Sequence, residues 1–228
     1  MGKGKLKKWK ENFSFDNVFQ PEMADIVEGK KFMAGQWHEK VFKNQNPLVL
    51  ELGCGKGEYT VGQARMFPDK NFLGVDIKGH RFWRGAKTSL EEGITNTAFL
   101  RTRIEFIDRF FEPNEVDEIW LTFSDPQPKN EKGNKRLTGP YFMEKYKKFL
   151  KEDGIVYIKT DNKILYTWSL EELTKAGYEI LEFTDDLYGN FITKQDPVMQ
   201  EILRFQTHYE KIFIDYTKTI NYIKLKLR

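Results

Sequence analysis

The segment Leu48-Val-Leu-Glu-Leu-Gly-Cys-Gly-Lys-Gly57 decides how this chain folds. Its first five residues are typical of a short buried strand, and three glycines at alternate positions follow them directly. Glycine allows the sharp turn that is needed there and lets a ligand approach the backbone. A dinucleotide-binding turn has the pattern G-x-G-x-x-G, whereas Glu58 stands here at the position of the third glycine. The spacing therefore disfavours a bound pyrophosphate.

Strand and helix patterns alternate on the carboxyl-terminal side of this segment. We predict further strands at 72–76, 97–101, 116–123, 154–159, 178–184 and 220–227. We predict helices at 59–67, 80–91, 140–150, 163–176 and 207–216, with a short one ending near 110, while 185–205 shows no clear pattern. This alternation predicts an α/β fold with a mainly parallel sheet and helices on both faces. Ligands of such sheets bind beyond the carboxyl ends of the strands, so the chemistry should lie there.

Composition narrows the class of protein. The 228 residues are 39% hydrophobic and 31% charged, which fits one globular domain without disulfides or membrane spans. A lone cysteine, Cys54, cannot form an internal disulfide, and no signal peptide opens the chain, so we expect a cytoplasmic protein. His38, His80 and His208 show no metal-ligand spacing with one another, and we expect no metal site.

The first 45 residues precede the strand–helix alternation. We interpret 1–45 as a basic, helical N-terminal extension, with an amphipathic helical arm over 23–42, and 46–228 as the main domain. Residues 1–10 carry five lysines and no acid. Such a segment suits contact with a phosphate backbone, but the charge alone favours the alternative of a solvated, frayed chain end.

Two acids complete the glycine pattern. Glu51 ends the first strand, and Asp76 ends the second strand 19 residues after Gly57. A carboxylate at the end of the second strand can accept hydrogen bonds from both ribose hydroxyls of a nucleoside. A second carboxylate at Glu51 suits a positively charged amino or sulfonium group. Together these residues predict an S-adenosylmethionine site, and Cys54 within the turn is expected to be a small packing residue.

Two further acids follow later strands. The fourth strand runs into Phe123-Ser-Asp-Pro-Gln-Pro-Lys129, and the fifth into Lys159-Thr-Asp-Asn162. Both acids should reach the same rim of the sheet as the glycine turn, and the prolines stiffen the loop around Asp125. Each residue also has a purely structural alternative. Asp125 could start a turn, and either Asp161 or Asn162 could cap the next helix.

The combined motifs resemble those of one enzyme family. Glu51-Leu-Gly-Cys-Gly-Lys-Gly57, Gly74-Val-Asp-Ile77, Ser124-Asp-Pro-Gln-Pro-Lys129, Lys159-Thr-Asp-Asn162 and Thr207-His-Tyr-Glu210 occur in this order. This set resembles the bacterial tRNA (guanine-N7)-methyltransferases over residues from about 45 to 215. The first motif is generic to class I S-adenosylmethionine-dependent methyltransferases, whereas the later motifs are more specific. The resemblance implies a Rossmann-like class I fold with a seven-stranded sheet, in which 46–228 form the methyltransferase domain.

The resemblance also assigns roles to individual residues. It implies cofactor binding by Glu51, Gly53, Gly55, Asp76, Arg103 and Asp125. It implies substrate binding by Lys129, Asp161, Thr207, Tyr209 and Glu210. It further implies that Asp125 is the catalytic residue. The chain departs from the family where an adenine-contacting Asp or Asn is usual, since Arg103 stands there with Thr102 beside it, and Gln127 replaces a usual Trp.

The implied reaction is methyl transfer to N7 of a guanine in tRNA, at the variable loop by resemblance, by a monomer or homodimer. We expect Asp125 and Asp161 to frame the guanine and Glu210 to read its edge. Two alternatives remain open: a methyltransferase that acts on another RNA or on protein, and a non-catalytic RNA-binding subunit with the same fold. The glycine spacing disfavours a nucleotide-linked oxidoreductase.

Overall fold

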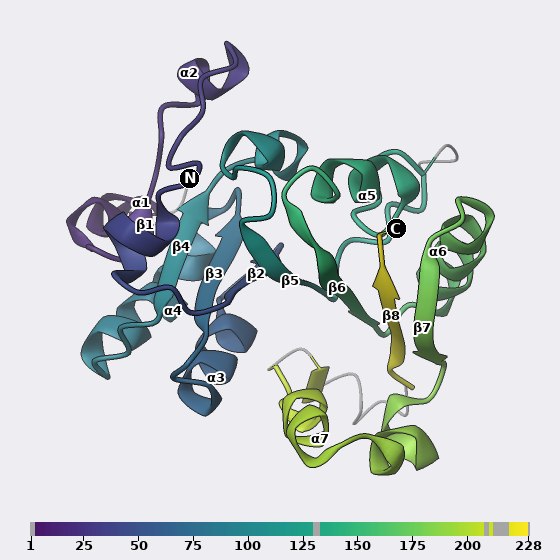
Figure 1. The fold of residues 1–228 in the computed structure, drawn as a ribbon. Helices are drawn as coiled ribbons and strands as arrows, with labels where there is room; N and C mark the ends of the chain where they lie inside the picture. Colours follow the sequence, from purple (N-terminus) through teal and green to yellow (C-terminus); the bar gives the residue numbers. More distant parts are fainter. Residues whose placement is uncertain (1–2, 130–132, 208–209, 212–218, 228) are drawn as a thin grey trace.

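One mixed sheet forms the centre of the computed structural model, which describes residues 3–129, 133–207, 210–211 and 219–227. Its strand order is β1-β4-β3-β2-β5-β6-β8-β7 (Figure 1). The strands are β1 Val18–Phe19, β2 Leu48–Leu52, β3 Asn71–Asp76, β4 Thr97–Arg101, β5 Val116–Thr122, β6 Leu150–Thr160, β7 Glu179–Thr184 and β8 Asn221–Lys226. The first six pair in parallel, and β8 lies antiparallel between β6 and β7. The predicted α/β class and mainly parallel sheet are confirmed.

The structure adds one strand to the seven that we predicted. β1 pairs in parallel with β4 through Val18 and Phe19 at the edge of the sheet. Two residues are too few to produce an alternating pattern, which is why the sequence did not indicate this strand. The remaining strands match the predicted positions closely, except that β6 begins at Leu150, where we had predicted the end of a helix.

Helices connect the strands and cover the sheet. They are α1 Lys3–Glu11, α2 Met23–Val27, α3 Glu58–Met66, α4 Gly79–Glu91, α5 Pro140–Tyr146, α6 Lys163–Lys175 and α7 Pro197–Arg204. Shorter 3-10 or π turns are η1 Asn12–Ser14, η2 Trp37–Phe42, η3 Ile104–Arg109, η4 Leu187–Phe191 and η5 Ile192–Lys194. The predicted continuous arm over 23–42 is wrong, because α2 and η2 are separate. Most of the predicted helix at 207–216 lies outside the described residues. No helix in the described parts of the chain has the length and apolar character to cross a membrane.

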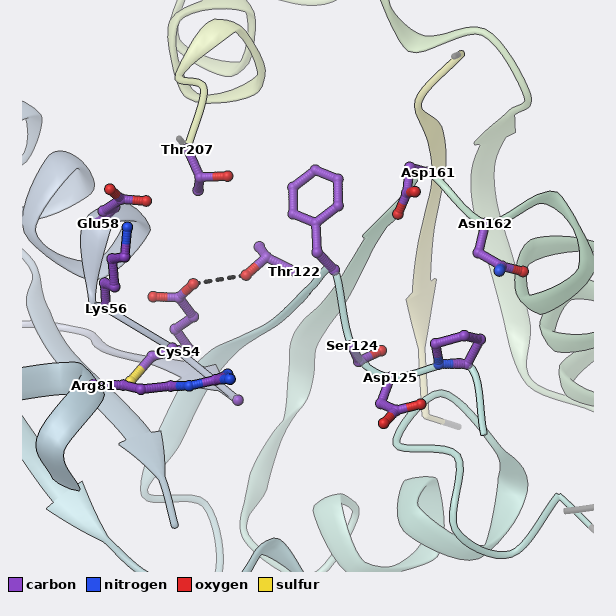
Figure 2. Close-up of a pocket in the computed structure, with 15 residues that line it drawn as sticks. Cys54, Lys56, Glu58, Arg81, Thr122, Ser124, Asp125, Asp161, Asn162 and Thr207 are labelled. Carbon is purple, nitrogen blue, oxygen red and sulfur yellow. Dashed lines mark hydrogen bonds between the residues drawn. The ribbon is translucent and has the colours of Figure 1, made fainter. Parts of the chain in front are cut away.

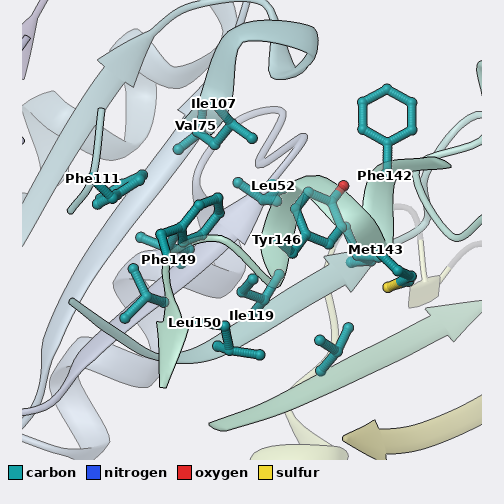
Figure 3. Packing of buried hydrophobic residues seen from close by; sticks show 14 of the residues in the cluster. Leu52, Val75, Ile107, Phe111, Ile119, Phe142, Met143, Tyr146, Phe149 and Leu150 are labelled. Atoms are coloured by element: carbon teal, nitrogen blue, oxygen red, sulfur yellow. The ribbon is translucent and has the colours of Figure 1, made fainter. Parts of the chain in front are cut away.

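The core divides between the two faces of the sheet because successive side chains of a strand point to opposite faces. Leu48, Leu50 and Leu52 belong to one cluster, which packs against α5 and α6, whereas Val49 belongs to a second cluster with α3 and α7. Figure 3 shows the first cluster, where Tyr146 and neighbouring side chains meet the sheet. This alternation directs Glu51 toward the face that α3 covers.

The N-terminal residues are tied to this core. Trp37 is fully buried in the first cluster, and its indole Nε1 donates to the Phe110 carbonyl oxygen at 2.7 Å. Asn12, just after α1, donates to the Gly79 carbonyl oxygen at the start of α4. The division into an extension at 1–45 and a domain at 46–228 stays a prediction, but β1 and Trp37 join that segment to the sheet.

Candidate active site

In the glycine turn after β2, Gly55 and Gly57 have different surroundings. Gly53, Gly55 and Gly57 all have positive φ, at 83°, 56° and 73°. A Cβ built on Gly55 meets nothing within 4 Å, whereas one on Gly57 would lie 2.5 Å from the Phe99 ring. Gly57 therefore has to be glycine for packing as well as for backbone conformation, and Gly55 leaves open space that a ligand could occupy.

Asp76 braces this turn from the end of β3. One carboxylate oxygen accepts from the Gly55 N–H at 3.0 Å, and the other accepts from the Lys78 N–H at 2.7 Å. Each oxygen of an ionised carboxylate has a further lone pair, so Asp76 can accept additional hydrogen bonds from a ligand. The side chain is 9% exposed and lines a cavity, which places this capacity at the surface of a binding site.

Glu51 is the most electrostatically perturbed acid of the site. It is 4% exposed, and its carboxylate accepts from the Thr122 hydroxyl at 2.7 Å and from the Thr60 N–H at 2.9 Å and hydroxyl at 2.5 Å. Burial raises the pKa of Glu51 to about 7, although the hydrogen bonds from Thr122 and Thr60 act in the opposite direction. A positively charged ligand group beside this carboxylate would favour its ionised form.

A cavity of about 490 Å³ opens beyond the carboxyl ends of β2, β5 and β6. Its walls include Glu51, Gly53, Gly55, Arg81, Asp125, Asp161 and Thr207. Figure 2 shows Asp125 and Asp161 on one side of this space, with Lys56 and Arg81 on the other. Residues from four separate motifs of the sequence therefore meet in one space.

A second cavity, of about 610 Å³, lies on the other side of the turn. It shares Gly53 with the first cavity and is lined by Asp76, Thr102, Arg103 and Gln127, among others. The Arg103 guanidinium forms an exposed ion pair with Glu105 at 2.9 Å, whereas Thr102 is buried. Because both cavities contact Gly53, they adjoin each other at the glycine turn.

Backbone strain accompanies the loop that carries Asp125. Phe123 and Gln127 have φ of 51° and 47°, a region that non-glycine residues seldom adopt and that clusters at functional sites. Asp125 itself is exposed, and its carboxylate accepts from the Gln127 N–H at 2.9 Å. The Arg136 Nε donates to the Pro126 carbonyl oxygen at 3.0 Å, and its guanidinium lies 4.2 Å from the centroid of the Trp168 ring. Arg136 therefore supports this loop.

The structure shows which of the two residues after β6 caps the next helix. Asn162 caps α6, because its side-chain oxygen accepts from the Leu165 N–H at 2.8 Å. Asp161 is not the cap residue of this helix, and both Asp161 and Asn162 line the first cavity. Lys129 is exposed at the end of a described segment, and it is absent from the described residues that line the two cavities.

The Thr207–Glu210 motif contributes one residue to the cavity wall and one to the core. Thr207 lines the first cavity, and its hydroxyl accepts from the Glu210 N–H at 3.2 Å. Glu210 is fully buried and pairs with Lys159 Nζ at 2.9 Å, and the Tyr188 hydroxyl also donates to it. Glu210 is absent from the described residues that line either cavity, and Tyr209 lies outside the described residues.

Sequence reasoning missed four residues that shape the site. Thr60 and Thr122 hold Glu51, Arg81 lines the cavity, and Lys159 anchors Glu210. Only Lys159 left a signal, as a charged residue at the end of the apolar run Ile155-Val-Tyr-Ile158. A lysine inside a strand that is buried on both faces indicates a buried ionic partner.

Known proteins resemble this chain in sequence and in fold. A family model described as a putative methyltransferase matches residues 45–216. A tRNA (guanine-N(7)-)-methyltransferase of Christiangramia forsetii is 48% identical over 226 residues, which cover 99% of each chain. One from Bacteroides thetaiotaomicron is 50% identical and covers 100% of this chain and 87% of that protein. The solved structure of the 16S rRNA methyltransferase KamB aligns with a TM-score of 0.62 at 12% identity, covering 86% of this chain and 94% of that one, which indicates a shared fold.

Proposed function

Since the chain belongs to the tRNA (guanine-N7)-methyltransferase family, we propose that the two adjoining cavities at the strand ends carry out that family's reaction. The enzyme transfers the methyl group of S-adenosylmethionine to N7 of a guanine in tRNA. One observation carries the assignment to this site. Glu51 and Asp76 flank the glycine turn, and Asp125 and Asp161 stand across the same cavity from Arg81.

The residues present fit S-adenosylmethionine. Gly55 leaves open space where a side chain would stand, Asp76 keeps acceptor capacity for ribose hydroxyls, and Glu51 suits the positively charged methionine end. We assign the adenine end to the second cavity, where Thr102 or Arg103 would contact the base. When bound, the cofactor supplies an electrophilic methyl group on a sulfonium.

The reaction does not require a strong general base. Guanine N7 carries an in-plane lone pair, so it would accept the methyl group in a direct displacement in which the carbon–sulfur bond breaks and a neutral thioether, S-adenosylhomocysteine, leaves. No proton has to leave first. The protein's task is then alignment and electrostatic stabilisation. Asp125 and Asp161 can accept hydrogen bonds from guanine N1–H and the 2-amino group, which adenine does not present. Their negative charge also stabilises the purine as it becomes positive.

Thr207 and Glu210 divide the role that the resemblance gives to their motif. We propose that Thr207 contacts the ligand from the cavity wall, because its side chain lines that wall. Glu210 holds this wall in place through Lys159 and Tyr188, since its carboxylate is already surrounded by these partners. Lys129, on the exposed loop after Asp125, suits a contact with the tRNA backbone rather than with the guanine.

Finer features of the activity follow the same proposal. The target is a guanine of the variable loop, and the cytoplasm, where tRNA is abundant, is the site of action. For its assembly, the proposal includes a monomer or a homodimer.

The test of this proposal is Asp125→Ala, with Asp125→Asn as the conservative variant. We expect methyl transfer to tRNA to fall by roughly a hundred-fold or more, while S-adenosylmethionine binding measured by calorimetry changes little, since most cofactor contacts lie elsewhere. Normal turnover in the alanine variant would remove Asp125 from the mechanism. Mass spectrometry of tRNA nucleosides from cells with and without the gene tests the target, and unchanged 7-methylguanosine would favour another RNA or a protein substrate.

A further inference from the structure

Positive charge is concentrated in two segments that are far apart in sequence. Residues 1–10 and 78–90 hold nine of the chain's 37 Lys and Arg and none of its 34 Asp and Glu. The rest of the chain therefore carries 28 cations against 34 acids, a formal charge of −6, although the whole chain is at +3. A polyanion approaching this molecule would be drawn to these segments wherever they lie together.

The fold brings the two segments into contact. Helix α1, from the first segment, packs beside α4, from the second, near the edge of the sheet that β1 and β4 form (Figure 1). Trp83 of α4 is the contact point: its Nε1 donates to the Glu11 carboxylate at 3.0 Å, and Lys8 Nζ lies 4.5 Å from its ring centroid. Lys87 also pairs with Glu11 at 3.2 Å. The acid that ends α1 is thus used in docking that helix.

Several other cations of the two helices face solvent. Lys5, Lys7 and Lys10 of α1 and Arg81 and Arg84 of α4 are exposed, as is Lys78 just before α4. We call these six residues the cationic face. Positions 78, 81 and 84 are spaced three residues apart, so their side chains follow one side of the helix. Burial, followed by the positive charges of Lys5, Arg81 and Lys78, lowers the pKa of His80 at the start of α4.

The α4 part of the cationic face reaches the active site. Arg81 belongs to it and also lines the cavity that contains Asp125. Arg84, one turn further along α4, lines a neighbouring cavity of about 460 Å³. The charged residues of that cavity also include the cations Lys56, Arg65 and Lys211 and the acids Glu58 and Glu92. α4 itself begins three residues after Asp76, at the end of β3. A phosphate backbone whose guanine enters the cavity would therefore leave it over this helix.

We propose that the cationic face binds the phosphate backbone of tRNA next to the target nucleotide, with α1 docked on α4 as an added RNA-binding element. This inference rests on the proposed function for the identity of the RNA. Lysine and arginine contacts of this kind give affinity and orientation but do not read bases. The face would hold the tRNA while the acids of the cavity select the guanine.

The test replaces Lys5, Lys7 and Lys10 by glutamine in the full chain and measures tRNA binding by fluorescence anisotropy at several salt concentrations. Lys8, Glu11 and Trp83 remain, so the docking of α1 is kept. We expect Kd to rise at least about ten-fold near 0.1 M salt. The slope of log Kd against log salt should become shallower by about 0.7–0.9 for each phosphate that the variant can no longer neutralise. KM for tRNA should rise while kcat and S-adenosylhomocysteine affinity stay close to the wild-type values.

A matched control removes the same charge elsewhere. Lys40, Lys43 and Lys147 are exposed on η2 or shortly before β2 and β6, so they lie away from the carboxyl ends of the strands. Equal weakening by Lys40→Gln, Lys43→Gln and Lys147→Gln, or wild-type affinity in the α1 variant, would overturn the inference. Binding is measured apart from methyl transfer. If RNA binding depends on the face but no 7-methylguanosine forms, the proposed function fails and the inference stands.

Discussion

Glu51 shows how burial can tune one side chain for a ligand. Its carboxyl group has a pKa of about 7 in the folded protein against an ordinary value of 4.5, with burial as the main cause. Because the folded-state value is the higher one, the contribution of Glu51 to stability is largest below pH 4.5 and is lost as pH rises through 7. A sulfonium or ammonium group beside it reverses this preference by favouring the ionised form.

We therefore expect S-adenosylmethionine binding to release protons near pH 6 and its affinity to rise with pH up to about 7. Calorimetry in two buffers with different ionisation enthalpies measures the release directly. Glu51→Gln should bind more weakly and release almost no protons. An equal proton release in the wild type and in this variant would show that another group titrates.

Lys159 and Glu210 form a buried pair whose disruption should be costly. Both side chains are 0% exposed, and Lys159 Nζ also donates to the Leu203 carbonyl oxygen at 3.2 Å. Lys159→Met leaves Glu210 buried without its cation, so we expect the unfolding free energy measured by urea denaturation to fall by about 3–5 kcal/mol. Lys148→Met, which removes one partner of the more exposed pair with Asp108, is the control and should change stability little.

A double variant, Lys159→Met with Glu210→Gln, should recover part of this stability because no unpaired charge is left. If Lys159→Met were as mild as Lys148→Met, the pair would not hold the cavity wall.

The residues that could be predicted best from the sequence are those whose role follows from their place at the end of a strand. Asp76 ends β3 and Asp161 directly follows β6, and parallel strands bring such positions to one rim. The sequence does not show which acids already form hydrogen bonds or ion pairs with other residues of the fold. Of the neighbours Asp161 and Asn162, only the structure shows that Asn162 caps α6. Likewise, only the structure shows that the Glu210 carboxylate is covered by Lys159 and Tyr188 and is therefore not available to a ligand. Those distinctions arise from contacts between distant segments.

The glycine turn carries the prediction that belongs to single elements. Gly55→Ala and Gly57→Ala each place a Cβ at positive φ, which costs about 1–2 kcal/mol. Gly57→Ala adds a clash with Phe99 and a Cβ 3.4 Å from the Gly85 Cα, so it should destabilise the fold more. Gly55→Ala adds no clash and should mainly weaken cofactor binding, because its Cβ enters the open space of the turn.

Urea denaturation and calorimetry with S-adenosylhomocysteine separate these effects. Equal stability of the two variants would mean that Phe99 moves freely and that the packing argument for Gly57 is wrong.

Elements with a clear hydrophobic pattern were predictable from the sequence. Elements whose order depends on packing against distant residues were not. β2, β3 and β4 lie at or within one residue of the predicted ranges because their apolar runs are bounded by polar turns. The segment 185–205 showed no pattern, yet it folds into η4, η5 and α7. Leu187, Ile192 and Leu203 there pack on the second core cluster, so their order comes from the sheet face and not from local propensity.

At the scale of the whole molecule, ligand binding should raise the unfolding free energy and the Tm. A ligand that binds only the folded state adds about 2.7 kcal/mol at 100 times its Kd, which is roughly 5–10 °C in Tm for a domain of this size. We expect S-adenosylhomocysteine to produce such a shift in differential scanning calorimetry. Asp76→Ala should show a much smaller shift, and the same shift in both proteins would place the ligand elsewhere.

The position of β8 has a consequence for how the protein is made. Residues 221–226 lie between β6 and β7, so β7 has no partner strand until the ribosome has synthesised them. Before that point, the edge of β6 is an open template for pairing with other chains. During translation, the nascent chain can assemble the six parallel strands first, and the polypeptide then has to insert its late strand into an existing gap. Truncation before residue 221 should therefore yield aggregation-prone chains rather than a smaller enzyme.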